Sequence, residues 1–348
     1  MINIFQPSLG DQELQAVKEV FESNWIGAGP KTKQFEEQFS KFISSDPDNV
    51  MMTNSCTEGM FQICDVLLGP GDEVIIPTIG FVGAANAVIA NGGTPVFCDV
   101  DSLSLNTTAE DIEKKITDKT KAVLLIHYAG WACDMDPIIE LCKEKDILII
   151  EDNACSVATT YKGKTTGTLG DFGVWSFDSM KILVAGDGSI IHAKDPSILK
   201  NIKTRSYLGL LSESGYSSTV DQKWWEYDIS YPGRRSVVND ITSAIGLVQL
   251  SRLEEFIDRR KQIHDYYNAF LGDLYWIQTP APIYESGLGD RESSYYMYWI
   301  QLQDEPTRDK LAMYLKENNV YTTLCIPLHQ ALKVEEVEYI AEKIRSFK

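Results

Sequence analysis

Phe172-Gly-Val-Trp-Ser-Phe-Asp-Ser-Met-Lys181 is a short apolar run that ends in a lysine. It is one of several β-rich runs that alternate with amphipathic stretches between about residues 50 and 195. This alternation is typical of helices packed on a mainly parallel sheet. We therefore predict an α/β fold with one large sheet of seven strands, over residues 49–53, 73–77, 94–99, 122–127, 146–151, 172–177 and 189–193.

The stretches between these strands have the apolar spacing of helices. Several have a helix-capping residue at their start, such as Asn106, Asp134 or Asp195. In such a fold the strand ends meet at one edge of the sheet, where α/β proteins place their ligands. The predicted helices cover residues 57–67, 81–90, 109–116, 134–145 and 196–205.

The C-terminal third has a different organisation. Residues 206–236 lack periodicity and are predicted to form a long loop, and 239–271 is predicted to be one long helix. A smaller α/β unit follows, so we expect a large domain over 1–240, whose N-terminal segment could contact the small one, and a small domain over 241–348. The predicted elements of the small unit are strands over 295–301 and 321–326 and helices over 307–316 and 334–346.

The composition excludes several classes of protein. The 348 residues are 44% hydrophobic and carry a net charge of −18, which argues against general binding to nucleic acid or to an anionic membrane. The apolar runs are too short to cross a bilayer, and no secretory signal opens the chain. Seven scattered cysteines without a C-x-x-C pair suggest neither a disulfide framework nor a zinc site, so we expect a cytoplasmic protein.

Lys181 is the first candidate for chemistry. An amine that follows an apolar strand is poorly hydrated, and poor hydration lowers the pKa of an ammonium group. A neutral lysine can condense with an aldehyde, so one interpretation is a Schiff-base lysine that holds pyridoxal phosphate (PLP). The alternative is a surface lysine after a buried strand.

Four further clusters follow or precede predicted strands. The turn around Cys56 and Thr57 opens a helix and could bind a phosphate, although small residues also occur in such turns for steric reasons. Asp152 ends an apolar strand and could pair with a protonated pyridine nitrogen, or cap a helix.

Phe81 follows a glycine beyond a strand, which could place its ring against a flat ligand or in the core. Ser176 offers a hydroxyl to a phosphate. The order of phosphate turn, ring stacker, pyridine carboxylate and Schiff-base lysine is what one PLP site needs.

The chain resembles the DegT-type sugar aminotransferases, which are fold-type-I PLP enzymes. The resemblance covers nearly the whole chain and rests on segments in the family's order, at 24–37, 69–77, 127–130, 150–152, 161–163, 167–172 and 240–250. It implies a homodimer with active sites shared between subunits. It also implies that an amino group passes from L-glutamate to a nucleotide-linked keto-deoxysugar, at C3 or C4, through an internal aldimine and pyridoxamine phosphate.

The resemblance also assigns site residues. Lys181 matches the Schiff-base lysine and Asp152 the partner of the pyridine nitrogen. Phe81 matches the ring-stacking aromatic, and the phosphate ligands match Ser176, Cys56 and Thr57.

Three departures from the family matter. Cys155 stands where relatives carry Gln or His near the PLP hydroxyl, and a thiol is a weaker hydrogen-bonding group. Arg235 stands where relatives have an asparagine donated by the second subunit. We expect this guanidinium to bind the phosphate across the dimer interface, with a solvent-facing arginine as the alternative. The third departure is length, because relatives continue for about thirty residues between Leu332 and the helix that starts at Val334.

Other residues and functions remain open. His329 could touch the sugar or nucleotide, but we favour a structural role, and the segment 224–227 could make the same contact. A sugar dehydratase of the same superfamily is disfavoured because it replaces the lysine with histidine. A PLP-binding sensor has no need of a proton-shuttling amine, and an oxidoreductase would need a G-x-G-x-x-G turn that is missing after the first strand.

Overall fold

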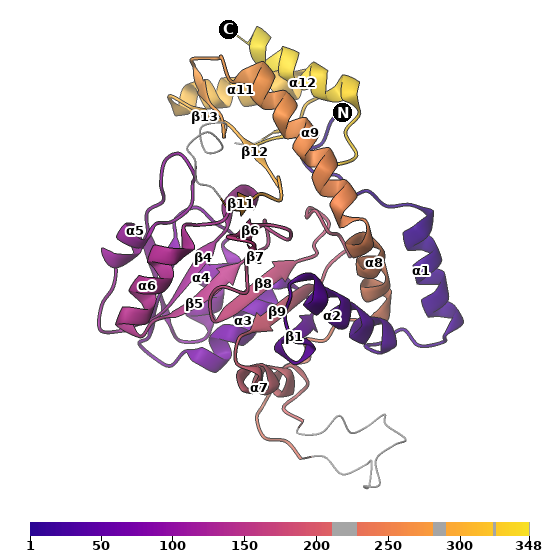
Figure 1. Ribbon diagram of the computed structural model, residues 1–348, viewed down its shortest axis with the longest axis vertical. Coiled ribbons are helices and arrows are strands. Elements are labelled where there is room, and N and C mark those ends of the chain that lie inside the picture. The colour runs from indigo at the N-terminus through magenta and orange to yellow at the C-terminus, as the bar shows by residue number, and fades with distance from the viewer. Residues whose placement is uncertain (211–227, 281–289, 323–324, 348) are drawn as a thin grey trace.

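The computed structural model describes residues 1–210, 228–280, 290–322 and 325–347. Its centre is a seven-stranded sheet in the order β1-β9-β8-β5-β4-β2-β3, which confirms the predicted fold class (Figure 1). Strand boundaries differ from the prediction by at most two residues, and those of β2 and β9 match it. The strands are β1 (Val50–Thr53), β2 (Glu73–Pro77), β3 (Thr94–Cys98), β4 (Thr120–Ile126), β5 (Leu148–Asp152), β8 (Phe172–Ser176) and β9 (Ser189–Ala193).

The direction of the strands determines where the site can form. β9 is antiparallel to both of its neighbours, β1 and β8, whereas the remaining pairs in this sheet are parallel. The carboxyl ends of β1, β8, β5, β4 and β2 therefore lie along one edge. This is the edge at which open α/β sheets bind ligands.

Helices cover both faces of the sheet. Since successive side chains of a strand point to opposite faces, each strand contributes to the cores on both sides. On one face, Ile76 and Leu124 pack with α3 (Cys56–Leu67), α4 (Gly83–Ala90) and α7 (Pro196–Ser206). On the other, Ile75 and Val123 pack with α6 (Met135–Lys145) and α5 (Ala109–Glu113). Residues of α2 (Pro30–Phe42) cover β1 and β8 on that side.

The C-terminal unit has its own apolar core. The helix α9 (Leu253–Leu271) runs from the large body into this unit and packs there with α11 (Glu305–Glu317) and α12 (Val334–Ser346) (Figure 1). The short strands of the unit are β10 (Ile277–Gln278), β12 (Tyr298–Trp299), β13 (Gln301–Leu302) and β14 (Cys325–Ile326). The division of the chain between residues 240 and 241 stays a prediction.

Several predicted elements were wrong in their extent. The helix over 239–271 is two helices, α8 (Asp240–Ser251) and α9, because Arg252 leaves helical geometry at φ −100° and ψ 2°. The strand predicted over 295–301 is reduced to the short strands β12 and β13, since the N–H of Tyr296 donates to Ala129 O in a neighbouring loop. The helix predicted from Phe81 begins at Gly83, and the one over 109–116 ends at Glu113.

Some elements were not predicted at all. They include α1 (Asp11–Glu22), α2 and a three-stranded sheet of β6 (Thr160–Tyr161), β7 (Lys164–Thr165) and β11 (Arg291–Glu292). Among the described residues no helix combines the length and the apolar character needed to span a bilayer.

Candidate active site

Lys181 lies in the loop between β8 and β9, at the edge where the strands end. The carboxylate of Asp178 accepts the N–H of Met180 at 2.8 Å, and the carbonyl of Asp178 accepts the N–H of Lys181 at 2.9 Å. A further bond from Ala185 N–H to Phe177 O closes the loop. The backbone of Lys181 is therefore fixed by its own turn.

The side chain of Lys181 points at a tyrosine that the sequence did not single out. Its Nζ donates to the Tyr296 hydroxyl oxygen at 3.4 Å and lies 5.1 Å from the centre of the same ring. Burial opposes the charge of the ammonium, but electrostatic interactions with the acidic groups of Cys155, Tyr296 and Asp152 outweigh this, so the pKa of Lys181 is raised. The predicted lowering of the Lys181 pKa is therefore wrong for the protein without cofactor. The apolar run around Lys181 does not reveal these acidic groups, because they are far away in the sequence.

Asp152 and Glu151 are adjacent in β5 and project to opposite faces of the sheet. Glu151 accepts the N–H groups of Gly167, Leu169 and Gly170, and its Oε2 lies 2.9 Å from His127 Nε2. Since Cys133 N–H donates to His127 Nδ1, the proton of this ring is on Nε2, which donates to Glu151. Glu151 is therefore a fully satisfied structural carboxylate.

Asp152 has a different environment. It is buried, and its Oδ1 accepts the N–H of Ala154 at 2.9 Å. Within the described ranges its other oxygen accepts no hydrogen bond. Burial raises the pKa of Asp152, against the effect of nearby Lys181. A buried carboxylate with a vacant oxygen is suited to a cationic or N–H partner.

The turn before α3 presents polar groups at the same edge. Ser55 caps the helix, since its Oγ accepts the N–H of Glu58 and its carbonyl accepts the N–H of Gly59. Among the described residues the N–H groups of Cys56 and Thr57 have no acceptor, nor does the Thr57 hydroxyl have a partner. These groups, with the positive end of the helix dipole, can bind an anion.

Phe81 lies beside this turn and not in the core. Its side chain is 67% exposed, so the core interpretation does not hold for this chain. A methyl group added at Gly83 would come within 3.0 Å of both the Phe81 ring and Thr57 Oγ1. The ring and the hydroxyl therefore border one small space that a glycine keeps open.

Ser176 and two cysteines complete the surroundings of Lys181. Ser176 ends β8, is buried, and accepts the N–H of Asp178 at 3.4 Å. Burial raises the pKa of Cys155 to about 11, and that of Cys56 is also raised by burial. Both thiols interact electrostatically with Asp152 and Lys181, so they line the same site and are neutral near pH 7.

Arg235 lies outside this group. It is exposed, and its guanidinium lies 5.1 Å from the ring centre of Tyr207. The neighbouring Ser236 anchors the segment, because its carbonyl accepts the Thr53 hydroxyl and its Oγ donates to Glu58. The segment thus reaches the first turn of α3, but the described contacts of Arg235 do not bring it to Lys181.

The remaining candidates have little bearing on the site. His329 is buried, its Nε2 lies 3.2 Å from Asn3 O, and burial lowers its pKa to about 4. This contact with the N-terminal segment is of the kind a structural role requires. Trp224, Trp225 and Tyr227 lie outside the described residues.

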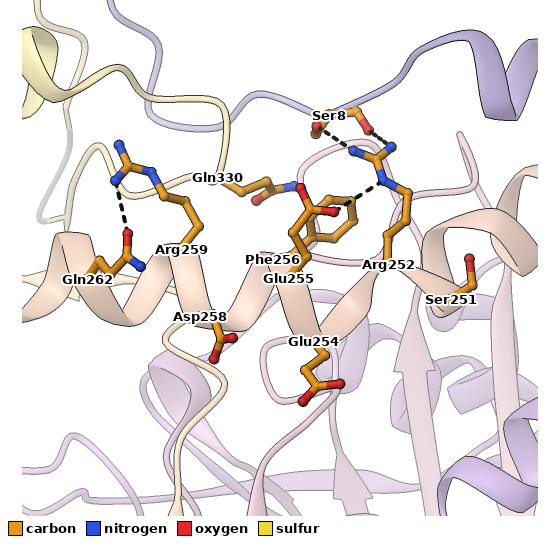
Figure 2. A pocket seen from close by; sticks show the side chains of 10 residues that line it. All are labelled: Ser8, Ser251, Arg252, Glu254, Glu255, Phe256, Asp258, Arg259, Gln262 and Gln330. Carbon is orange, nitrogen blue, oxygen red and sulfur yellow. Dashed lines mark hydrogen bonds and ion pairs between the residues drawn. The ribbon is translucent and has the colours of Figure 1, made fainter.

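A pocket of about 690 Å³ lies elsewhere, beside the first half of α9 (Figure 2). Its two arginines are already engaged: Arg252 pairs with Glu13 at 2.8 Å, and Arg259 donates to Leu332 O at 2.8 Å. We assign the chemistry to the surroundings of Lys181, because none of the sequence-predicted site residues lines this pocket. Its lining residues are Ser8, Ser251, Arg252, Glu254, Glu255, Phe256, Asp258, Arg259, Gln262 and Gln330.

The geometry around Lys181 fits PLP. An amine, a buried carboxylate with a vacant oxygen, an exposed aromatic ring and a helix N-terminus with unused N–H groups match the aldehyde, ring nitrogen, flat ring and phosphate of that molecule.

Comparisons with known proteins agree with this geometry. Residues 7–345 match the DegT/DnrJ/EryC1/StrS aminotransferase family. The chain is 41% identical to the dTDP-4-dehydro-2,3,6-trideoxy-D-glucose 4-aminotransferase of Saccharopolyspora spinosa over 375 residues, covering 99% of this chain and 96% of that protein. Because 375 exceeds the 348 residues of this chain, the relative has additional residues inside the matched region.

Two solved structures have the same fold. The aminotransferase TlmJ from Streptoalloteichus hindustanus is 41% identical, with a TM-score of 0.93 and coverage of 99% of this chain and 98% of that one. The putative sugar aminotransferase Spr1654 from Streptococcus pneumoniae, in its PMP form, is 26% identical, with a TM-score of 0.90 and coverage of 99% and 98%.

Proposed function

Because this chain belongs to the DegT/DnrJ/EryC1/StrS aminotransferase family, whose members similar to it are sugar aminotransferases, we propose that it aminates a nucleotide-linked keto-deoxysugar with L-glutamate as donor. The observation that carries the proposal is that Lys181 and Asp152 face the same site at the carboxyl edge of the sheet. We place this activity in the cytoplasm, in keeping with the seven free cysteines.

The cofactor of the family is PLP, and a related structure carries its pyridoxamine form. When bound, PLP supplies an aldehyde that condenses with amines and a ring that withdraws electrons. We propose that Asp152 holds a proton on the ring nitrogen, and that Phe81 lies against the ring. The hydroxyls of Thr57 and Ser176 and the first N–H groups of α3 would bind the phosphate, with Cys155 near the ring hydroxyl.

Lys181 has two tasks in this scheme. Its Nζ would hold the cofactor through its aldehyde, and the same nitrogen would be a free amine once the amino donor is bound in its place. The free amine of Lys181 would act as a base toward the Cα proton of the amino donor, and as an acid that returns a proton when the sugar is aminated. Its position is favourable because the Asp178 turn fixes its backbone while its side chain remains within the site.

The substrate class rests on the relatives. The Saccharopolyspora spinosa protein is named for a dTDP-linked 4-dehydro sugar, and another relative, 31% identical, is the GDP-perosamine synthase of Escherichia coli O157:H7. Both names describe nucleotide sugars, and the first specifies amination at C4. We therefore propose a 4-keto nucleotide sugar as the first substrate to test.

We also propose that the active unit is a homodimer and that Arg235 reaches the phosphate site of the partner subunit. Two observations support this. Arg235 is exposed and belongs to a segment anchored beside α3, and Phe81, Val82 and Met180 leave an apolar surface around the site.

The test is direct. Purified protein loaded with PLP should be yellow, and L-glutamate should bleach the colour, which a 4-keto nucleotide sugar should then restore. Lys181→Ala should lose about a thousandfold or more of the turnover. The exposed Lys200→Ala on α7 is the matched control. Colour that no amino acid bleaches would contradict the proposal and favour a PLP-binding sensor.

A further inference from the structure

Tyr296 is the group nearest to the reacting nitrogen that the proposed function leaves without a task. Its hydroxyl oxygen lies 3.4 Å from Lys181 Nζ and 3.3 Å from the carbonyl oxygen of Met180. A carbonyl can only accept, so the hydroxyl proton is directed to Met180 O. The oxygen lone pairs are therefore available to an N–H of Lys181.

Tyr296 is held by one contact of its ring and two hydrogen bonds of its backbone. Phe5, from the N-terminal segment, stacks on it with centroids 5.5 Å apart and ring planes 14° apart. The backbone N–H of Tyr296 donates to Ala129 O, and its carbonyl accepts Nη1 of Arg260 at 3.0 Å. Arg260 is fully buried and its Nη1 also donates to Leu328 O at 2.8 Å, so a shift of this carbonyl would break one bond of a buried network.

We propose that Tyr296 is a further catalytic residue, whose hydroxyl oxygen accepts a hydrogen bond from Lys181 Nζ and so holds the proton that Lys181 carries between transfers. This inference rests on the proposed function. The hydroxyl stabilises the charged amine, because an acceptor favours the protonated form. It also directs Nζ, because the stacking of Phe5 and the two backbone bonds hold Tyr296 in place.

Loss of the hydroxyl should change two rates in opposite directions, that of PLP loading and that of the glutamate half-reaction. A neutral Lys181 must add to the aldehyde of PLP, with loss of one water, before colour appears. Without the hydroxyl the amine loses its proton at lower pH, so PLP should load faster onto Tyr296→Phe. The glutamate half-reaction should slow, because the transferred proton is held less well.

The experiment uses the full-length protein freed of PLP and mixed rapidly with PLP between pH 6 and pH 9. For Tyr296→Phe we expect loading about threefold to tenfold faster at pH 7, with its rise shifted to lower pH, and glutamate bleaching slower by a similar factor. Tyr298→Phe is the matched control, because it removes a buried hydroxyl that donates to Asn268 Oδ1 at 2.9 Å, away from Lys181. It should leave both rates unchanged.

The outcomes separate the two proposals. Wild-type protein that never colours with PLP overturns the proposed function. Coloured wild type together with a Tyr296→Phe variant that loads no faster, or that slows in both steps, overturns the role of Tyr296 alone. If the phenylalanine variant fails to fold, Tyr296→Met removes the hydroxyl with a side chain that adapts to the space, and the same two rates decide.

Discussion

Glu151 and Asp152 are adjacent carboxylates with different surroundings, which suit one to a structural role and the other to ligand binding. Glu151 accepts hydrogen bonds from three backbone N–H groups and from His127, so both of its oxygens are satisfied. Asp152 accepts a single N–H and keeps one oxygen vacant among the described residues. A carboxylate whose two oxygens are both hydrogen-bonded stabilises the fold, whereas one with a vacant oxygen is available to a ligand.

Exchanging each acid for its amide should separate these roles. Glu151→Gln replaces an acceptor oxygen by a donor, so we expect a loss of about 2–4 kcal/mol in the free energy of unfolding. Asp152→Asn should change that free energy by less than about 1 kcal/mol but slow glutamate bleaching by about a hundredfold or more. Urea titration and half-reaction kinetics measure the two effects. Equal effects of the two variants on stability would contradict this division.

The sequence predicts the candidate site residues at or shortly after strand ends, because strand ends are recognised from short-range pattern alone. Asp152 and Ser176 end β5 and β8, and Lys181 lies in the loop after β8. Tyr296 could not be predicted, since its position depends on a backbone bond to Ala129, far away in the sequence. The raised pKa of Lys181 escaped prediction for the same reason.

At the scale of elements, the seven strands were predicted because buried parallel strands are nearly continuous apolar runs. The break between α8 and α9 was not, because residues 239–271 contain no proline and no glycine near the break. It occurs at Arg252, whose guanidinium is bound by Glu13 and Ser8 of the N-terminal segment. Tertiary contacts, which local pattern does not contain, set this boundary.

The start of α4 offers a test of the phosphate site. In Gly83→Ala the new methyl would lie 3.0 Å from Thr57 Oγ1 and the Phe81 ring, so both must shift by a few tenths of an ångström. We expect the affinity for PLP to fall by about threefold to tenfold. Gly80→Ala is the control, since its methyl would meet nothing within 4 Å. Equal PLP affinities for the two variants, measured by equilibrium titration, would contradict the position assigned to Thr57 and Phe81.

At the scale of the whole molecule, buried histidines make stability depend on pH. Burial lowers the pKa of His264 to about 3 and that of His329 to about 4. The unfolded chain therefore binds more protons below pH 6.5, and stability falls as the pH falls. Each histidine should lower the free energy of unfolding by about 2 kcal/mol when the pH falls from 7 to 5.

Urea unfolding at the two pH values tests this with His329→Gln. The variant should show a loss between pH 7 and pH 5 that is smaller by about 2 kcal/mol than that of wild type, whatever its stability at pH 7. An unchanged difference would mean that His329 takes up its proton in the folded protein.

The shared site can be tested by mixing two impaired variants. A dimer of one Lys181→Ala and one Arg235→Ala subunit has one intact site if Arg235 acts in the partner, and none if it acts in its own subunit. Random reassociation should then recover about a quarter of wild-type activity at limiting PLP. Activity no higher than that of the separate variants would place Arg235 outside the partner's site.

The most direct measurement is the location of the covalent bond to PLP. Borohydride reduction of the yellow protein, followed by digestion and mass spectrometry, identifies the lysine that carries the pyridoxyl group. We expect the label on the peptide that contains Lys181 and its absence after incubation with L-glutamate. A label on another lysine, or none on a protein that has taken up PLP, would contradict the central role of Lys181.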